Sequence, residues 1–201
     1  MTAPDVGLDS ELARVAAVLL DERVVRRVIK KHHKLHGVGL QVPHAMCDTI
    51  DKAALLAIVE PDELPVDPAQ LPDRVTIFMG ARGPLMAGDA GELSRAWRAL
   101  FHARVHQALD ARRAAGALPA AAVRARIHHI GQIEFDEIRS VLRQEDLLLP
   151  PGDDTATYIE LVALYLELRA FAPEALERTF PTVDLARVDA AIALDLDPAA
   201  L

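Results

Sequence analysis

The segment TATYIELVALYLELRAFA, residues 155–172, predicts an α-helix with almost no polar face. Apolar residues occur all around its helical wheel, and the charged exceptions are Glu160, Glu167 and Arg169. Helices of this kind are normally central and buried. We therefore expect this segment to lie at the centre of the fold, with other helices covering it.

Two long helical patterns come before the central segment. The first, residues 89–116, starts at a capping aspartate and stops at Gly116, and the second, residues 119–145, opens with a proline and can break near Gly131. Together with the central helix they are expected to form the principal core. Shorter helices are predicted to start near residues 173 and 184.

The N-terminal part of the chain is also expected to be helical. An Ala/Leu/Val pattern runs from Asp9 to about His36 and predicts one long helix or two shorter ones. TIDKAALLAIVE, residues 49–60, predicts a further helix, which Asp48 or Thr49 could cap.

Two segments interrupt these helical patterns. Residues 61–73 include four prolines and cannot form a regular helix, so we expect a surface connection or a subdomain boundary there. RVTIFMG, residues 74–80, is the one β-like run, and no partner strand is evident for it. A single short strand contributes little sheet.

The fold class predicted from these elements is all-α. We expect six to eight helices, at most one short β-like segment near residues 74–80, and an irregular helical bundle. The composition agrees, because 51% of the residues are hydrophobic and only 4% are aromatic, a mix that favours helices over sheets. With 201 residues, the default expectation is one domain over residues 1–201.

Charge and cysteine content restrict the classes of function. A formal net charge of -8 argues against a nucleic-acid-binding protein, which normally carries an excess of Lys and Arg. The single cysteine, Cys47, suits a reducing cytosol, so the expected location is cytoplasmic. The apolar run at residues 15–20 is too short for a transmembrane segment and has acids on both sides and no basic n-region, so neither a span nor a signal peptide is expected.

The stretch FHARVHQAL, residues 101–109, places His102 and His106 one helical turn apart. On the helical wheel both histidines lie beside the apolar stripe, in line with Arg95 and Arg113. Two arginines so close would oppose a bare divalent cation. A metal ion at this position would therefore need carboxylates from other parts of the chain.

Two acids are candidates for that role. Glu134 falls inside the apolar stripe of its helix, and a core-facing carboxylate must be paired, hydrogen-bonded or protonated. Glu160 is one of the few polar residues of the central helix. Two imidazoles and one carboxylate suit zinc or iron with an open position for water. The candidate metal ligands are His102, His106, Glu134 and Glu160.

The same residues allow a structural interpretation. The acids could form salt bridges with Arg95, Arg98 and Arg113, and the histidines could hydrogen-bond into that network. The zinc-peptidase motif His-Glu-x-x-His does not apply, because Ala103 stands where that motif has its general base. A hydrolase would need a base elsewhere, such as Glu134, Glu137 or Glu167, whereas an iron oxygenase would not need that glutamate.

RVVRRVIKKHHKLHG, residues 23–37, has basic residues on one helical face and Val, Ile and Leu on the other. Such a face could bind an acidic protein partner or a phosphate-bearing ligand. Alternatively it is the solvated outer side of a core helix. The cationic face consists of Arg23, Arg26, Arg27, Lys30, Lys31 and Lys34.

A second set of metal-ligand types follows the cationic face. It consists of His32, His33, His36, His44 and Cys47, and contains a single thiolate, whereas structural zinc sites usually contain two or more. Alternatively, the cysteine is a small buried hydrophobe and the histidines end a helix, where the helix dipole favours them.

The sequence contains no complete catalytic motif. It therefore favours a non-catalytic helical interaction or regulatory domain that uses the cationic face. The alternative is a metal-dependent enzyme, of the hydrolase or oxygenase type, that holds Zn or Fe with two histidines and one carboxylate on a helical bundle.

Overall fold

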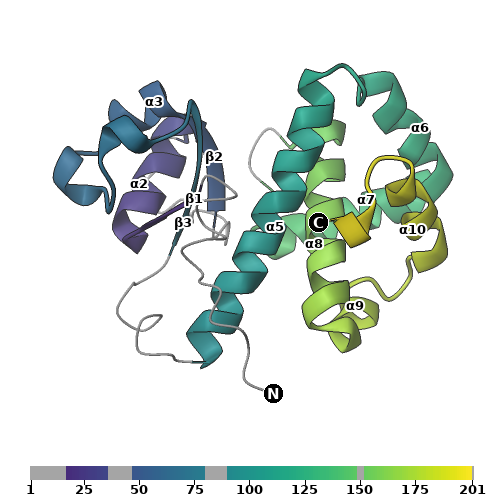
Figure 1. Cartoon of the computed structure of the whole chain (residues 1–201). Coiled ribbons are helices and arrows are strands. Elements are labelled where there is room, and N and C mark those ends of the chain that lie inside the picture. Colours follow the sequence, from purple (N-terminus) through teal and green to yellow (C-terminus); the bar gives the residue numbers. More distant parts are fainter. Residues whose placement is uncertain (1–16, 36–46, 80–89, 149–151, 201) are drawn as a thin grey trace. The chain divides into compact units, whose positions relative to one another are not determined.

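The computed structural model describes residues 17–35, 47–79, 90–148 and 152–200 (Figure 1). The chain divides into two compact units, Met1–Ala103 (unit 1) and Arg104–Leu201 (unit 2). Most of the described residues are helical, as predicted, but unit 1 also contains a three-stranded mixed sheet. The all-α assignment was therefore right only for the predominance of helix. A single domain over residues 1–201 stays a prediction.

The sheet of unit 1 has the strand order β1-β3-β2. β3 (Arg74–Met79) is the predicted β-like run, and it lies between β1 (Ala17–Leu20), which is parallel to it, and β2 (Cys47–Asp51), which is antiparallel. The expectation that β3 has no partners was wrong. The four residues of β1 were taken for part of a helix, because periodicity alone does not separate a short apolar strand from a helix.

The two faces of this sheet are covered by different helices. Side chains alternate between the faces along each strand. On one face, Leu19 and Phe78 pack with Ala99 and Leu100 of α5 (Ala90–Ala114), and Cys47 lies half-buried against this cluster. The opposite face is largely buried, and α2 (Glu22–His32) and α3 (Lys52–Leu56) contact its strands (Figure 1). Its buried residues are Val18, Leu20, Ile50, Val75 and Ile77.

The helix α2 is shorter than its sequence pattern suggests. Its four buried residues, Val24, Val25, Val28 and Ile29, form the predicted apolar side. The helix ends at His32, because Lys34 adopts the left-handed conformation with a φ of 51°. The Leu35 amide then donates to the Lys30 carbonyl at 2.8 Å, and the Lys34 amide donates to the Lys31 carbonyl at 3.3 Å. These two bonds form a Schellman motif, which is a regular way to end a helix.

The segment after β2 also differs from its prediction. The expected helix 49–60 is a strand as far as Asp51 and a helix, α3, only from Lys52 to Leu56. The proline-rich segment 61–73 forms two short 3₁₀ helices, η1 (Pro61–Glu63) and η2 (Pro68–Gln70). Leu64 and Leu71 anchor this segment in the core of unit 1.

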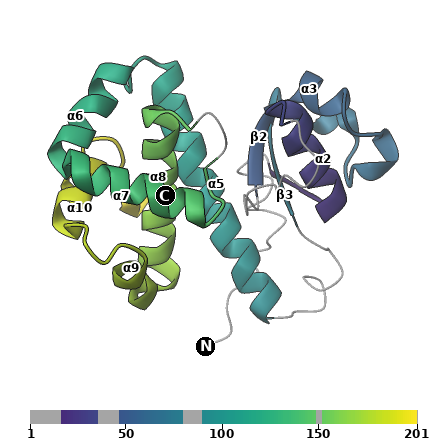
Figure 2. The ribbon, with the colours of Figure 1, turned by 180° about the vertical axis from the view of Figure 1, so that it is seen from behind.

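Unit 2 follows the predicted helices closely. After α5 come α6 (Ala120–Ile130), α7 (Gln132–Gln144) and α8 (Asp154–Phe171), followed by α9 (Pro173–Thr179), α10 (Leu185–Ala193) and η3 (Pro198–Ala200). The predicted break at Gly131 is present, with a φ of 113° that favours glycine. α8 has ten buried residues and contacts α6, α7 and α9 (Figure 2), so the central position of this helix is confirmed.

None of the helices in the described ranges has the length and apolar character needed to cross a lipid bilayer.

A buried polar network holds the last helix of unit 2 in place. The Asp195 side chain is fully buried and accepts two hydrogen bonds of 3.0 Å from the Arg126 guanidinium. The Tyr158 hydroxyl on α8 donates to the same carboxylate at 2.7 Å. Burial and the neighbouring carboxylate raise the pKa of Tyr158 far above its usual range, so this hydroxyl remains a donor. The network joins α6, α8 and the end of α10.

We expect Asp195→Ala to destabilise unit 2 by about 3 to 5 kcal/mol, because it leaves the Arg126 charge without its partner. Urea denaturation followed by circular dichroism measures this change. Asp136→Ala is the matched control, since Asp136 forms an exposed pair with Arg139 that should contribute at most about 1 kcal/mol. Equal losses in the two variants would contradict the role given to the Asp195 network.

Candidate metal centres

The predicted pair His102 and His106 lies on a single helix, α5. The four-residue spacing therefore places the two imidazoles one turn apart on a continuous helix. Both side chains are half-buried. The local geometry of the pair is set by the helix itself.

Glu160 of α8 lies against this pair. Its carboxylate Oε2 is 3.2 Å from Nε2 of His106, and its side chain is only 12% exposed. One ring nitrogen of each histidine and one oxygen of Glu160 all lie within 4.8 Å of one another. The structure thus brings together three of the four residues that the sequence singled out as metal ligands.

Glu134 is not brought to the histidines. It does not belong to either of the donor groups that the described residues could offer to one metal ion. Its carboxylate instead lies over Gly131 at the start of α7, where a Cβ atom on the glycine would stand 2.0 Å from Oε2. The positive end of the helix dipole favours a carboxylate in this first turn. The expectation that Glu134 faces the core is corrected, because its side chain is half-buried beside its own helix terminus.

The structural interpretation of the histidine pair expected salt bridges between nearby arginines and the acids, and the structure shows a partner for one of these arginines. Arg113 pairs with Asp110, one turn earlier on α5, at 3.0 Å. It therefore has an acid on its own helix. His106 is a charge partner of Glu160.

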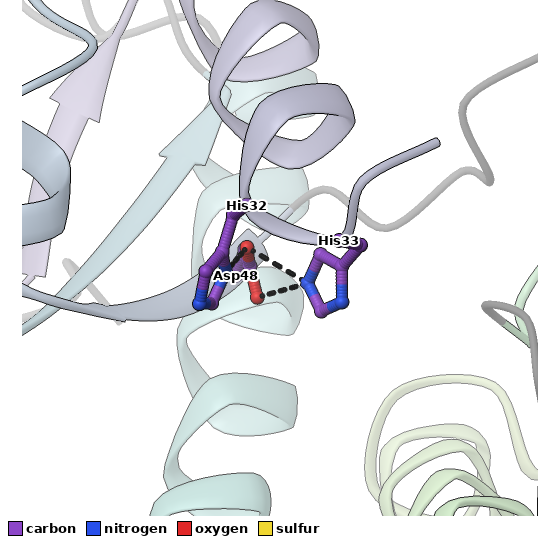
Figure 3. Close-up of side chains that lie close together, drawn as sticks. All are labelled: His32, His33 and Asp48. Carbon is purple, nitrogen blue, oxygen red and sulfur yellow. Dashed lines mark hydrogen bonds and ion pairs between the residues drawn. The ribbon is translucent and has the colours of Figure 1, made fainter. Parts of the chain in front are cut away.

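A second cluster of metal-ligand types occurs in unit 1 (Figure 3). Nδ1 of His32 lies 2.9 Å from Oδ2 of Asp48, and Nε2 of His33 lies 3.1 Å from both oxygens of the same carboxylate. His32 ends α2, His33 is the next residue, and Asp48 is the second residue of β2. The three side chains therefore come from two elements that pack against each other.

This cluster overlaps only partly with the second predicted ligand set. His32 and His33 belong to both, whereas His36 and His44 lie outside the described residues. Cys47 is on the other face of β2, packed against the apolar cluster with Leu19 and Phe78. Asp48 was missed because it was interpreted as a helix cap. Reading CDTID as a strand would have separated Cys47 from Asp48 by the alternation of side chains.

The charges in this cluster support one another. The hydrogen bond to Asp48 raises the pKa of His32 above its ordinary value, although burial partly opposes that effect. Burial alone would raise the pKa of Asp48, but hydrogen bonds from both histidines hold it below its ordinary value. The metal-free cluster therefore favours a protonated imidazole beside an ionised carboxylate.

Two of the six basic residues of the predicted cationic face are paired with acids. Arg27 forms a half-buried ion pair with Glu63 of η1, and Arg26 pairs with Glu22 one turn away on α2. In the described part of the chain, no acid lies within ion-pair distance of the other four basic residues. These are Arg23, Lys30, Lys31 and Lys34.

Comparisons with known proteins give no assignment. The chain matches no protein-family model, no curated protein sequence and no solved structure. The functional inferences below therefore rest on contacts within the chain.

The His32–Asp48 pair predicts a pH-dependent stability of metal-free unit 1. The raised pKa of His32 gives a contribution that is complete below pH 6.5 and is lost as the pH rises through the raised value. The lowered pKa of Asp48 gives a contribution that is present above pH 3.8 and is lost as the pH falls through the lowered value. The advantage of the wild type over Asp48→Asn should therefore be largest between pH 3.8 and 6.5.

Urea denaturation in the presence of a chelator, followed by Trp97 fluorescence, measures this difference. Trp97 is the single tryptophan and packs against the apolar cluster of unit 1, so it reports on this unit. Asp73→Asn, an exposed change near β3, is the control and should show no such pH profile. A difference between wild type and Asp48→Asn that is constant from acidic to alkaline pH would contradict the assignment.

Proposed function

We propose that this protein binds a divalent transition-metal ion through His102, His106 and Glu160 and acts as a metal-dependent enzyme of the hydrolase or oxygenase type. The observation that carries the proposal is the 3.2 Å approach of the nearly buried Glu160 carboxylate to Nε2 of His106. The ligand types were expected from the sequence, and the helix spacing supplies His102 as the third donor.

The donor set supports zinc or iron as the metal. Two imidazole nitrogens and one carboxylate oxygen are typical of catalytic zinc and of non-haem iron, whereas magnesium and calcium prefer oxygen donors alone. Two ligands on one tetrahedral zinc ion lie roughly 3.4 Å apart, given zinc–ligand distances of about 2.0 to 2.1 Å. The distance of 3.2 Å between His106 and Glu160 is close to this separation.

Three protein ligands leave part of the coordination sphere for other molecules. If His102, His106 and Glu160 held zinc, the ion would supply Lewis-acid chemistry and an activated water for hydrolysis. If they held iron, the ion would supply the chemistry of a non-haem oxygenase. Glu167 lies seven residues after Glu160, on the same side of α8, and is the next acid toward the C-terminal end of that helix.

His106→Ala should remove most of the bound metal, because it removes one of three protein ligands. Glu160→Gln should do the same while keeping the size of the side chain. The measurement is the metal content of purified protein and of protein reloaded with Zn²⁺, Fe²⁺ or Co²⁺. The control is His129→Ala, which removes an exposed histidine from α6 of the same unit.

Both ligand variants should keep the circular dichroism spectrum of the wild type, since Glu160→Gln keeps the size of the side chain and alanine at position 106 favours helix. If the wild type cannot be loaded, or if the two variants bind as much metal as His129→Ala, the proposal is wrong.

We propose, as a second candidate function, that α2 and the turn that follows it bind an acidic protein segment. The contact residues are Arg23, Lys30 and Lys31 of α2 and Lys34 of the turn, and none of them has an acidic partner in the described ranges. Arg26 and Arg27 contribute less, because Glu22 and Glu63 already neutralise them.

Replacing Arg23 and Lys31 together by Glu should weaken binding of a fluorescent acidic peptide by about tenfold or more, measured by anisotropy. Stability should change little, since both side chains are exposed. The matched control reverses Arg124 and Arg143, two exposed arginines of unit 2. Equal binding by the two double variants would show that the face of α2 is only solvated surface.

A further inference from the structure

We propose that His32, His33 and Asp48 form a separate binding site for a divalent transition-metal ion of the zinc class. The site lies wholly within unit 1 and does not depend on the α5 and α8 residues of the proposed function (Figure 3). It differs from the ligand set expected from the sequence, because Asp48 takes the place of the cysteine.

The backbone presents the three donors in a fixed arrangement. The Schellman motif at the end of α2 holds two consecutive histidines, one as the last helical residue and one as the cap. Their rings are 4.6 Å apart between centroids and inclined by 62°. Asp48 is held opposite them because it pairs with Ile77 of β3 in the sheet. In Figure 3 both rings point toward the Asp48 carboxylate.

The distances suit ligands of one metal ion. Neighbouring donors at right angles on a metal lie roughly 3.0 Å apart for metal–ligand distances of about 2.1 Å, and tetrahedral donors lie about 3.4 Å apart. The two imidazole nitrogens approach Asp48 at 2.9 and 3.1 Å. An ion could therefore replace the shared hydrogen atoms with shifts of a few tenths of an ångström. Each ring would then carry its proton on its other nitrogen.

Charge and exposure point in the same direction. The Asp48 side chain is 11% exposed, and within the described ranges its charge partners are the two histidines, with no Lys or Arg at ion-pair distance. The histidines are 31% and 28% exposed, so an ion can reach them from solvent. A divalent ion would compensate the carboxylate in place of the protonated imidazole of the metal-free cluster.

Nitrogen and mixed nitrogen–oxygen donor sets select the zinc class of ions over magnesium and calcium. Three protein ligands leave at least one position for water. The partial exposure of all three residues is consistent with an ion that exchanges with solvent and differs from a closed structural zinc site, which normally has four protein ligands.

The test is calorimetric titration with Zn²⁺ alone of the full chain carrying His106→Ala and Glu160→Gln, so that the site of the proposed function is disabled. One equivalent of Zn²⁺ should still bind. Adding Asp48→Asn should abolish that binding or weaken it at least about 100-fold, since even changes outside the ligand shell cost about 10- to 100-fold. Adding His33→Gln should have the same effect.

Two further changes are matched controls. Cys47→Ser should leave Zn²⁺ affinity unchanged, because the thiol lies on the other face of β2, and so should Asp51→Asn on the same strand. Circular dichroism verifies that each variant is folded. Absence of Zn²⁺ binding in the His106→Ala, Glu160→Gln protein would overturn the proposal, as would binding that Asp48→Asn and His33→Gln leave unchanged. Failure of the proposed function gives a different result: the wild type then binds no more Zn²⁺ than this double variant.

Discussion

A helix that is apolar on every side has to be covered on every side, and α8 imposes this constraint on unit 2. Each of its polar side chains at the core must then find a partner from a covering element. Tyr158 donates to Asp195, and Tyr165 donates to Asp189 of α10 at 2.9 Å. Glu160 meets His106 of α5. The candidate metal centre is therefore one of several places where a polar side chain of the buried helix has a specific partner on a neighbouring element.

The helical part of the fold could be predicted from the sequence because its signals are local. The all-round apolar pattern of α8, the break at Gly131 and the capping residues each act within a few positions. The sheet is different. β1 pairs with β3 through residues as far apart as Ala17 and Thr76, and four apolar residues carry no period that separates a strand from a helix. The sheet depends on pairing between distant segments, and the pattern of apolar residues within one segment does not reveal such pairing.

The candidate sites divide in the same way. The spacing of His102 and His106 is a property of one helix and was visible in the sequence. The sequence could not show whether Glu134 or Glu160 lies beside the histidines, because that depends on how α7 and α8 are placed around α5. Wheel arithmetic put Glu134 on the apolar stripe, but a residue in the first turn can fold back over its helix terminus, as Glu134 does over Gly131. Asp48 could be recognised only once its segment was known to be a strand.

The alternation along β2 has a consequence for how the chain tolerates change. Cys47 and Asp48 are adjacent in sequence but belong to opposite faces of the sheet, Cys47 to the face packed against α5 and Asp48 to the face that meets α2 and the histidines at its end. If β2 slipped by one residue against β3, the thiol would turn toward the imidazoles and the carboxylate would enter the apolar cluster. Such a slip would exchange an oxygen donor for a sulfur donor and bury a charge at the same time. The packing of Cys47 against the apolar cluster thus also fixes which side chain of β2 faces the histidines.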